Sequence, residues 1–159
     1  MKIIIDTREQ AFFDFSGFQA ETERATLPAG DYSLPGFEDR VAIERKELND
    51  LIACLMNGNR ERFERELGKL RYYELAAVVV EASLEDVSKG RYRSDMSAHS
   101  ALQSIFAFQV RYRVPFIFAG SRTAAQYVTF SLLEKYLGEI EKRYDRAFPA
   151  ERKAAHVQN

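Results

Sequence analysis

The alternation of hydrophobic and polar positions first indicates a set of short strands. Lys2–Asp6 is a β-branched run that ends in a charge, which predicts a buried strand. Val41–Lys46 shows the period of two that is typical of a strand. Leu75–Val80 and Val114–Ala119 are apolar throughout and predict central strands that are covered on both faces.

Between and after these runs the period becomes helical. Asn49 and Asp50 can cap a helix whose apolar stripe, Leu51–Met56, stops near residues 57–59. Further amphipathic stretches predict helices around Phe63–Leu70, over Ser97–Arg113 and over Thr123–Phe148. Turn residues at Pro28–Tyr32 and Gly36–Arg40 separate the early strands.

This order of elements predicts an α/β fold with a mixed central sheet flanked by helices. The chain has 159 residues, of which 46% are hydrophobic, a size that suits one compact domain. We expect that domain to extend over residues 1–148. Residues 149–159 lack apolar periodicity and are expected to form a mobile C-terminal tail.

The composition narrows the classes of function. Met1–Ile5 runs directly into Asp6, so we expect no signal peptide, no membrane span and an intracellular, cytoplasmic location. Cys54 has apolar neighbours, and His99 and His156 have no partner at metal-ligand spacing. We therefore expect no disulfide framework, zinc site or histidine catalysis. Because the net charge is −1, a polyanionic partner would have to meet a local basic patch.

The segment from residue 30 to residue 50 concentrates the residues that suit metal-dependent chemistry. Asp31 lies in a turn, Glu44 and Lys46 share one face of the predicted strand, and Asp50 begins the next helix. A turn aspartate or a charged strand end is, taken singly, most often structural. Burial of Asp31 and Glu44 together is costly without a cation, and Mg²⁺ is typically held by one or two carboxylates with substrate phosphate. Lys46 can then orient or help deprotonate a water and neutralise charge on a phosphate.

A second acidic cluster follows the first strand. Asp6 and Glu9 reach the same end of the sheet if the first strand lies beside Val41–Lys46, and would then be outer ligands or groups that orient water. Arg8 can hold a carboxylate or a phosphate bidentately. Capping of the loop is the structural alternative for this cluster.

Basic residues occur in three groups that can contact nucleic acid. The predicted second helix carries Arg60, Arg62 and Arg65. In a Gly-containing loop, basic residues surround a tyrosine: Lys89, Arg91, Tyr92 and Arg93. A later segment repeats this arrangement with Arg111, Tyr112 and Arg113. Such clusters attract phosphates, and an unpaired base that stacks on a tyrosine contributes about 1 to 3 kcal/mol. An ordinary solvated face is the alternative, which we favour for the last group.

Taken together, these residues resemble the nuclease domain of the XPF-type (ERCC4-like) structure-specific endonucleases. The match consists of Asp6-Thr7-Arg8-Glu9, Gly30-Asp31-Tyr32 and the Glu44-Arg45-Lys46 triplet followed by Asp50. It covers residues 2 to about 138, nearly the whole chain, and is strongest in the first half. Asn59 precedes Arg60 where the family has a glycine.

The resemblance implies a restriction-endonuclease-like fold in which Asp31 and Glu44 bind Mg²⁺ or Mn²⁺ and Lys46 is catalytic. It also implies catalytic-site positions for Asp6, Glu9, Arg45 and Asp50, and cleavage of one DNA strand near branched, flapped or forked junctions. No helix-hairpin-helix pair is expected after Phe148 and no helicase module before Met1. A helicase or DNA-binding partner protein would supply what those modules contribute.

Two further hypotheses remain beside an active endonuclease. A catalytically inactive nuclease-fold subunit could bind DNA and position a partner, although the acidic and lysine positions are all present. A phosphoesterase acting on small molecules is disfavoured by the absence of histidines near the site. The predicted last helix carries an apolar stripe that is either core or a homodimer face: Tyr127, Phe130, Leu133, Leu137, Ile140 and Tyr144.

Overall fold

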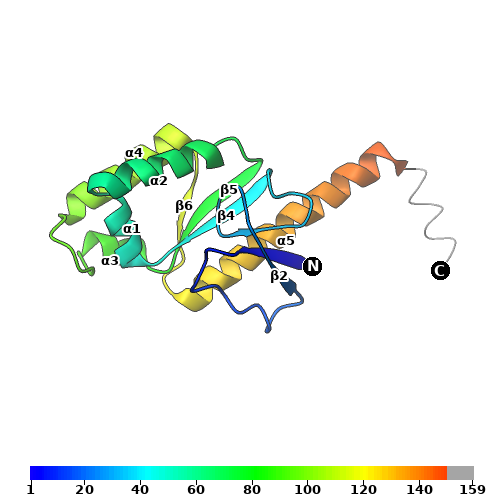
Figure 1. Ribbon diagram of the computed structural model, residues 1–159, viewed down its shortest axis with the longest axis horizontal. Coiled ribbons are helices and arrows are strands. Elements are labelled where there is room, and N and C mark those ends of the chain that lie inside the picture. The colour runs from blue at the N-terminus through cyan, green and yellow to red at the C-terminus, as the bar shows by residue number, and fades with distance from the viewer. Residues whose placement is uncertain (150–159) are drawn as a thin grey trace.

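A computed structural model describes residues 1–149, in which a mixed sheet of six strands lies between two layers of helices (Figure 1). The strands are β1 (Lys2–Asp6), β2 (Glu21–Ala25), β3 (Tyr32–Ser33), β4 (Val41–Lys46), β5 (Leu75–Val80) and β6 (Phe116–Phe118). The helices are α1 (Leu48–Cys54), α2 (Asn57–Leu70), α3 (Leu84–Ser88), α4 (Ala98–Tyr112) and α5 (Arg122–Ala147). This arrangement confirms the predicted α/β class.

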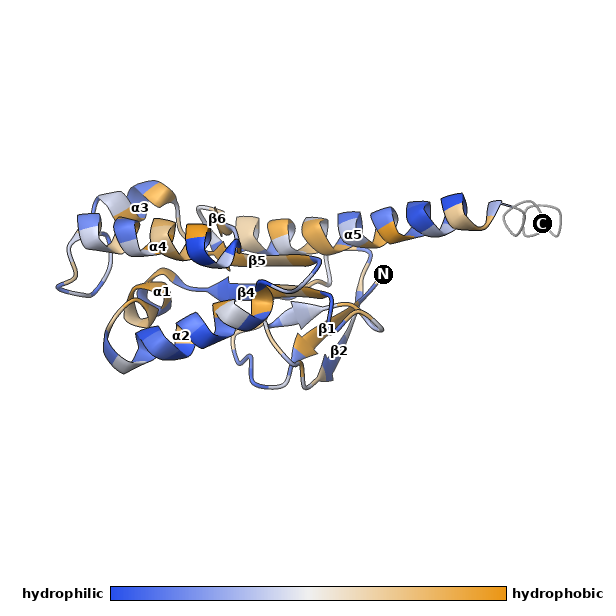
Figure 2. Ribbon diagram, turned by 90° about the horizontal axis from the view of Figure 1, so that it is seen from above, coloured by the Kyte–Doolittle hydropathy of each residue, from blue (hydrophilic) through white to orange (hydrophobic). Residues whose placement is uncertain are grey.

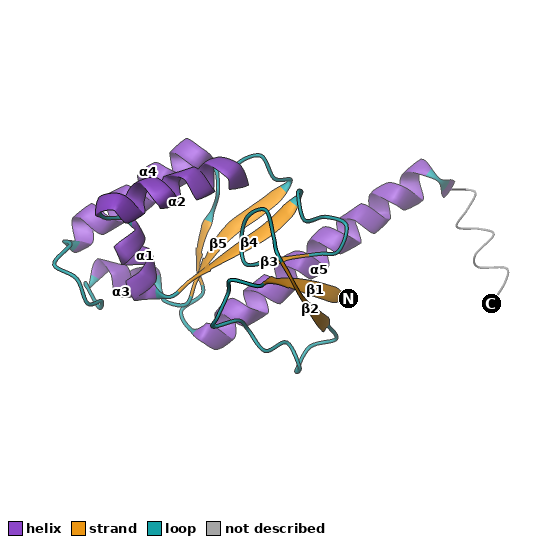
Figure 3. Ribbon diagram, viewed as in Figure 1, coloured by secondary structure: helices purple, strands orange, loops and turns teal. Residues whose placement is uncertain are grey.

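The strand order in the sheet is β2-β1-β3-β4-β5-β6. The pairs β1–β2, β4–β5 and β5–β6 are parallel, whereas β3 pairs antiparallel with both β1 and β4. The short β3 therefore connects the N-terminal strands to the central parallel strands. Figure 3 shows the long loop that leads from β1 to β2 on one side of the sheet.

The two faces of β4 belong to two separate cores. Ala42 faces a cluster formed mainly by α1, α2 and α4, while Val41 and Ile43 face a second cluster covered by α5. The apolar β5 is buried on both faces and appears orange in Figure 2, whereas the outer helix α2 is largely blue. The alternation predicted for Val41–Lys46 is therefore confirmed.

Several predicted boundaries differ from the structure. The first helix begins after Glu47, which makes no side-chain cap, so neither Asn49 nor Asp50 is its N-cap residue. Instead, the Asn49 side chain accepts a hydrogen bond from the backbone N–H of Arg93. Helix α1 ends at Cys54, close to the predicted stop, and residues 57–59 form the first turn of α2. Asn57 has a left-handed φ of 50° and turns the chain between the two helices.

Other elements are shorter than predicted or unexpected. The strand expected over Val114–Ala119 is shorter and corresponds to β6. Helix α3 was not predicted, because its sequence has no clear helical periodicity; it begins with a capping box between Ser83 and Asp86. The tail expected at residues 149–159 lies outside the described residues, apart from residue 149. No helix among the described residues is long and apolar enough to cross a membrane.

The apolar stripe of α5 mostly packs onto the sheet. Leu133 is buried, and Phe130, Leu137 and Ile140 are partly buried against the second core. Tyr127 and Tyr144 are exposed, by 62% and 52% of their surface. Core packing is therefore the main role of this stripe in the monomer, and the homodimer stays a prediction.

Candidate active site

Backbone hydrogen bonds bring the ends of β1, β3 and β4 together. The backbone N–H of Asp31 donates to the carbonyl of Ile43 at 2.9 Å, and the N–H of Asp6 donates to the carbonyl of Asp31 at 2.8 Å. The Oδ2 atom of Asp31 also accepts a hydrogen bond from the N–H of Arg45 at 2.7 Å. The turn carboxylate is therefore fixed beside the strand that carries Glu44 and Lys46.

Gly30 makes this close approach sterically feasible. Its φ is 75°, in the left-handed region, and a Cβ atom built at this position would lie 2.9 Å from the Cβ of Ala42. A side chain at residue 30 would push the turn away from β4. Glycine at this position thus determines how closely Asp31 approaches the strand.

Glu44 and Lys46 lie side by side on one face of β4. Glu44 is only 3% exposed, and the Nζ atom of Lys46 donates a hydrogen bond to its Oε1 atom. The ammonium group of Lys46 also lies over the ring of Phe63, 5.5 Å from its centroid. Strand β4 therefore presents a buried carboxylate and a partly buried ammonium group as a pair.

Burial and neighbouring charges shift the pKa values of all three groups. Burial raises the pKa of Glu44 to about 7, although the Lys46 charge opposes this shift. Burial, together with the Glu44 charge, raises the pKa of Asp31 well above its usual value. Burial alone would lower the pKa of Lys46, but the Glu44 charge and hydrogen bond outweigh it and raise that pKa. The carboxylates thus resist ionisation while Lys46 holds its proton.

These carboxylates fit a hard divalent cation. The Oε2 atom of Glu44 is buried and has no hydrogen-bond partner, which is costly for a polar atom unless another group satisfies it. Mg²⁺ and Mn²⁺ prefer carboxylate oxygens and commonly keep water and substrate phosphate as their other ligands. Among residues 1–149, no three His, Cys, Asp or Glu side chains form a ready-made cage. The donor set therefore suits an ion that also binds its substrate.

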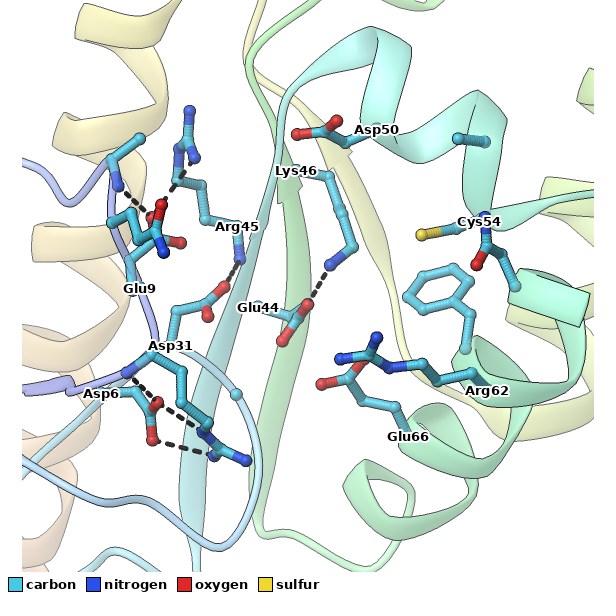
Figure 4. A pocket seen from close by; sticks show the side chains of 17 residues that line it. Asp6, Glu9, Asp31, Glu44, Arg45, Lys46, Asp50, Cys54, Arg62 and Glu66 are labelled. Carbon is cyan, nitrogen blue, oxygen red and sulfur yellow. Dashed lines mark hydrogen bonds and ion pairs between the residues drawn. The ribbon is translucent and has the colours of Figure 1, made fainter.

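A cleft of about 600 Å³ opens above Asp31, Glu44 and Lys46 (Figure 4). Strand ends and the β1–β2 loop form one wall, and helices α1 and α2 form the other. The predicted site residues that line it are Asp6, Arg8, Glu9, Asp31, Glu44, Arg45, Lys46, Asp50 and Arg62. The structure therefore brings together all of the predicted catalytic residues and two of the predicted DNA contacts.

Asp6 occupies this wall with both of its oxygen atoms already engaged. Its Oδ1 accepts from the backbone N–H and Nε of Arg8, and its Oδ2 accepts from Nη2 of Arg8 and the backbone N–H of Leu27. Burial would raise the pKa of Asp6, but these hydrogen bonds outweigh it and lower that pKa. In this arrangement Asp6 orients Arg8, whose guanidinium group reaches the cleft. Its predicted role as an outer ligand or water-orienting group stays a prediction.

Arg45 points to the opposite face of β4 and holds the β1–β2 loop. Its Nε donates to Oε1 of Glu81 at 2.7 Å, and its Nη1 lies 3.6 Å from Oε1 of Glu9. Glu81 also accepts from Arg122, which in turn donates to the carbonyls of Ala11 and Phe12. This network fixes the loop that carries Glu9 at the edge of the cleft.

Three polar residues of the helical wall were not predicted as site residues. Asn59, Cys54 and Glu66 line the helical wall, and the burial of Cys54 raises the pKa of its thiol. The only sequence signal for Glu66 is its position three residues after the buried Phe63, beside the apolar stripe of α2. Asp50 lies in the first turn of α1 and is exposed to the cleft.

The other predicted DNA contacts lie away from the cleft. Arg60 donates to the Leu55 carbonyl and to Oγ of Ser104 and stacks over Phe108, so it joins α2 to α4. In the loop after α3, Lys89 pairs with Glu85, Arg91 pairs with Asp86, and the Tyr92 hydroxyl donates to the Met96 carbonyl. Arg93 lies next to the first turn of α1 through its bond to Asn49.

Comparisons with known proteins agree with this fold. The family model described as "ERCC4 domain" matches residues 5–132. A solved structure of XPF from Aeropyrum pernix superposes with a TM-score of 0.67 at 21% identity, covering 94% of this chain and 74% of that chain. A structure of XPF from Aeropyrum pernix in complex with DNA superposes with a TM-score of 0.63 at 22% identity, covering 87% of this chain and 66% of that chain. A search of curated proteins gave no match.

The two structural likenesses confirm the predicted restriction-endonuclease-like fold, since the mixed sheet and its flanking helices are shared with the XPF nuclease domain. The family match spans most of the residues that the structure describes, including every strand residue from Ile5 to Phe118. It also spans the whole lining of the cleft. The chain therefore belongs to the ERCC4 domain family, a family of nucleases.

Proposed function

We propose that this protein is a metal-dependent DNA endonuclease that hydrolyses phosphodiester bonds at branched, flapped or forked DNA. The observation that carries the proposal is the buried, unpartnered Oε2 atom of Glu44 beside Lys46 and Asp31 at the floor of an open cleft. A carboxylate oxygen held there without a partner suits a cation, and the cleft gives a phosphate access to it.

Each residue has a separate role in this proposal. Asp31 and Glu44 would hold Mg²⁺ or Mn²⁺, which, when bound, polarises a phosphoryl oxygen and lowers the pKa of a coordinated water. Lys46 keeps its proton because its pKa is raised, which favours neutralising charge on the phosphate over removing a proton from water. The contact of Lys46 with Phe63 limits where the ammonium group can move.

The walls of the cleft suit a phosphate backbone. Arg8 projects from one wall while its side chain remains 67% exposed, and the exposed Arg62 lies on the other. Two cations on opposite walls can contact phosphates of a strand that passes over Glu44 and Lys46. The XPF structure in complex with DNA supports DNA as the polymer, and family membership supports a structured substrate.

The proposal is tested with purified wild-type protein and Asp31→Asn, Glu44→Gln and Lys46→Met variants. Labelled flap, fork, single-stranded and duplex DNA are incubated with Mg²⁺, Mn²⁺ or chelator, and binding is measured in parallel. We expect metal-dependent cleavage that prefers the branched substrates, and a loss of at least 100-fold in each variant while the folded structure is retained.

Glu61→Gln is the matched control, because Glu61 is an exposed carboxylate of α2 that does not line the cleft. It should cleave like the wild type. Wild-type protein that binds DNA but cuts none of these substrates with either metal would contradict an endonuclease that acts alone and would favour a DNA-binding subunit or a nuclease that needs a partner.

A further inference from the structure

Helix α2 contributes one carboxylate to the cleft, that of Glu66. We propose that Glu66 is a third ligand of the cation site, facing Asp31 and Glu44 from the opposite wall. The inference rests on the proposed function, because it assigns a further residue to the same ion. It makes the site a bridge between the sheet and α2.

Among residues 1–149 no three carboxylates already surround a cation position, but Glu66 lies on the wall opposite Asp31 and Glu44. In Figure 4 its carboxylate projects from α2 toward Glu44, and both residues line the same cleft. Helix α2 is fixed against the core by Phe63, Leu67 and Leu70, which are 1%, 0% and 0% exposed. The position of Glu66 on this wall is therefore determined by the packing of the residues around it.

The free oxygen of Glu44 also indicates a cation in this part of the cleft. Glu44 Oε2 is buried without a hydrogen-bond partner, although Lys46 satisfies Oε1 of the same group. The charge of Glu66 adds to the rise in the pKa of Glu44, in keeping with the orientation of the two side chains in Figure 4. Carboxylates that approach each other in this way need a cation between them or a shared proton.

The carboxylates of Asp31, Glu44 and Glu66 outnumber the ammonium group of Lys46 beside them, while Asp50 and Arg62 contribute one further charge of each sign to the cleft. Arg8 is engaged by Asp6, and Arg45 by Glu9 and Glu81. At the floor of the cleft Lys46 neutralises one of the three carboxylates of Asp31, Glu44 and Glu66. A single divalent cation would neutralise the other two.

A purely structural role for Glu66 is the competing explanation. Its charge also acts on Lys46, so it could serve as a second counter-charge for that ammonium group. In that case Glu66→Gln would destabilise the metal-free protein. As a cation ligand, Glu66 repels Glu44 when no metal is present, so the same substitution would leave the metal-free protein equally stable or more stable.

The first measurement is Mn²⁺ binding by isothermal titration calorimetry without DNA, for the wild type, Glu66→Gln, Glu44→Gln and the control Glu61→Gln. We expect Glu66→Gln to weaken binding by about tenfold or more and Glu61→Gln to leave it unchanged. Weak binding by Glu44→Gln together with unchanged binding by Glu66→Gln would overturn the role of Glu66 and leave the proposed metal site standing. Unchanged binding by both, or no Mn²⁺ binding by the wild type, would overturn the site itself.

The second measurement is thermal unfolding of the same proteins in chelator and in Mg²⁺. We expect Glu66→Gln to have a Tm in chelator at or above that of the wild type and a smaller increase on addition of Mg²⁺. A lower Tm in chelator with an undiminished increase in Mg²⁺ would show that Glu66 is a structural partner of Lys46 and would overturn the inference.

Discussion

The guanidinium group of Arg45 and the carboxylate of Glu81 form a buried ion pair between the ends of β4 and β5, with Nε and Oε1 2.7 Å apart. Their side chains are 8% and 9% exposed. Arg45 follows Glu44 directly, so this pair fixes the backbone beside the candidate metal ligand. Through Arg122 the same network reaches the loop at Ala11 and Phe12.

We expect Glu81→Gln to destabilise the protein by about 3 kcal/mol, because it leaves Arg45 buried without its main counter-charge. Chemical denaturation measures this change. Glu134→Gln is the control, since Glu134 pairs with Lys135 on the surface, and such pairs contribute about 0–1 kcal/mol. A loss no larger than that of the control would show that Glu9 alone compensates Arg45.

Two residues of this network, Glu81 and Arg122, were not predicted from the sequence. Val41–Lys46 and Leu75–Val80 were predicted as strands because burial dictates their side-chain patterns. Glu81 and Arg122 were not identified, because their partners lie 36 and 41 residues away along the chain and each looks like an ordinary surface charge. Only the three-dimensional pairing of β4 with β5 and the start of α5 reveals their role.

The candidate site, like this network, was predictable from the sequence only in part. The spacing of Asp31, Glu44 and Lys46 follows from one turn and one strand, so local rules place these residues together. Glu66 belongs to a helix, and its approach to Glu44 depends on how α2 packs on the sheet. The two-residue strand β3 is too short to produce a period, although it determines the position of the turn.

Gly30→Ala should destabilise the fold and displace Asp31. The left-handed conformation costs a non-glycine residue about 1–2 kcal/mol, and overlap with Ala42 adds to it, so we expect a loss of about 3 kcal/mol. Cleavage should fall with it, as measured on a forked substrate at a temperature where the variant is folded.

Gly36→Ala is the matched control. Gly36 has a φ of 80°, but a Cβ atom at that position would contact nothing within 4 Å. We expect it to lose only about 1 kcal/mol and to retain wild-type cleavage. Equal losses of stability and of cleavage in the two variants would show that the approach to Ala42 is unimportant.

The raised pKa of Glu44 predicts a pH dependence of stability in the absence of metal. Its folded-state pKa of about 7 exceeds the usual value of 4.5, so the folded protein holds the proton more tightly than the unfolded chain. The stabilisation from this proton is complete below pH 4.5 and is lost as the pH rises through 7. Its size across this range is about 3 kcal/mol.

Comparison of the wild type with Glu44→Gln measures this contribution together with its effect on Asp31, whose pKa the Glu44 charge also raises. The substitution also removes the carboxylate that accepts a hydrogen bond from Lys46. Because Lys46 keeps its charge throughout this pH range, the free-energy cost of losing that bond does not change with pH. In chelator, we expect the unfolding free energy of the variant relative to the wild type to rise between pH 5 and pH 8. A relative stability that stays the same at both pH values would contradict the burial of an ionisable Glu44.

Loss of Arg60 should lower stability, whereas loss of Arg62 should weaken DNA binding, although the two residues lie only two positions apart on α2. Arg60 is tied to Leu55 and Ser104, so we expect Arg60→Ala to destabilise the protein by about 1–2 kcal/mol. Arg62 is exposed and lines the cleft, so Arg62→Ala should leave stability unchanged and weaken DNA binding.

Fluorescence anisotropy of labelled forked DNA, measured in chelator at several salt concentrations, tests this difference. If Arg62 contacts one phosphate, its removal should reduce the slope of log affinity against log salt by about 1. Arg60→Ala, at a temperature where it is folded, should keep the wild-type slope. The opposite assignment would mean that DNA crosses the α2–α4 side of the molecule and not the cleft, because only there could Arg60 meet a phosphate.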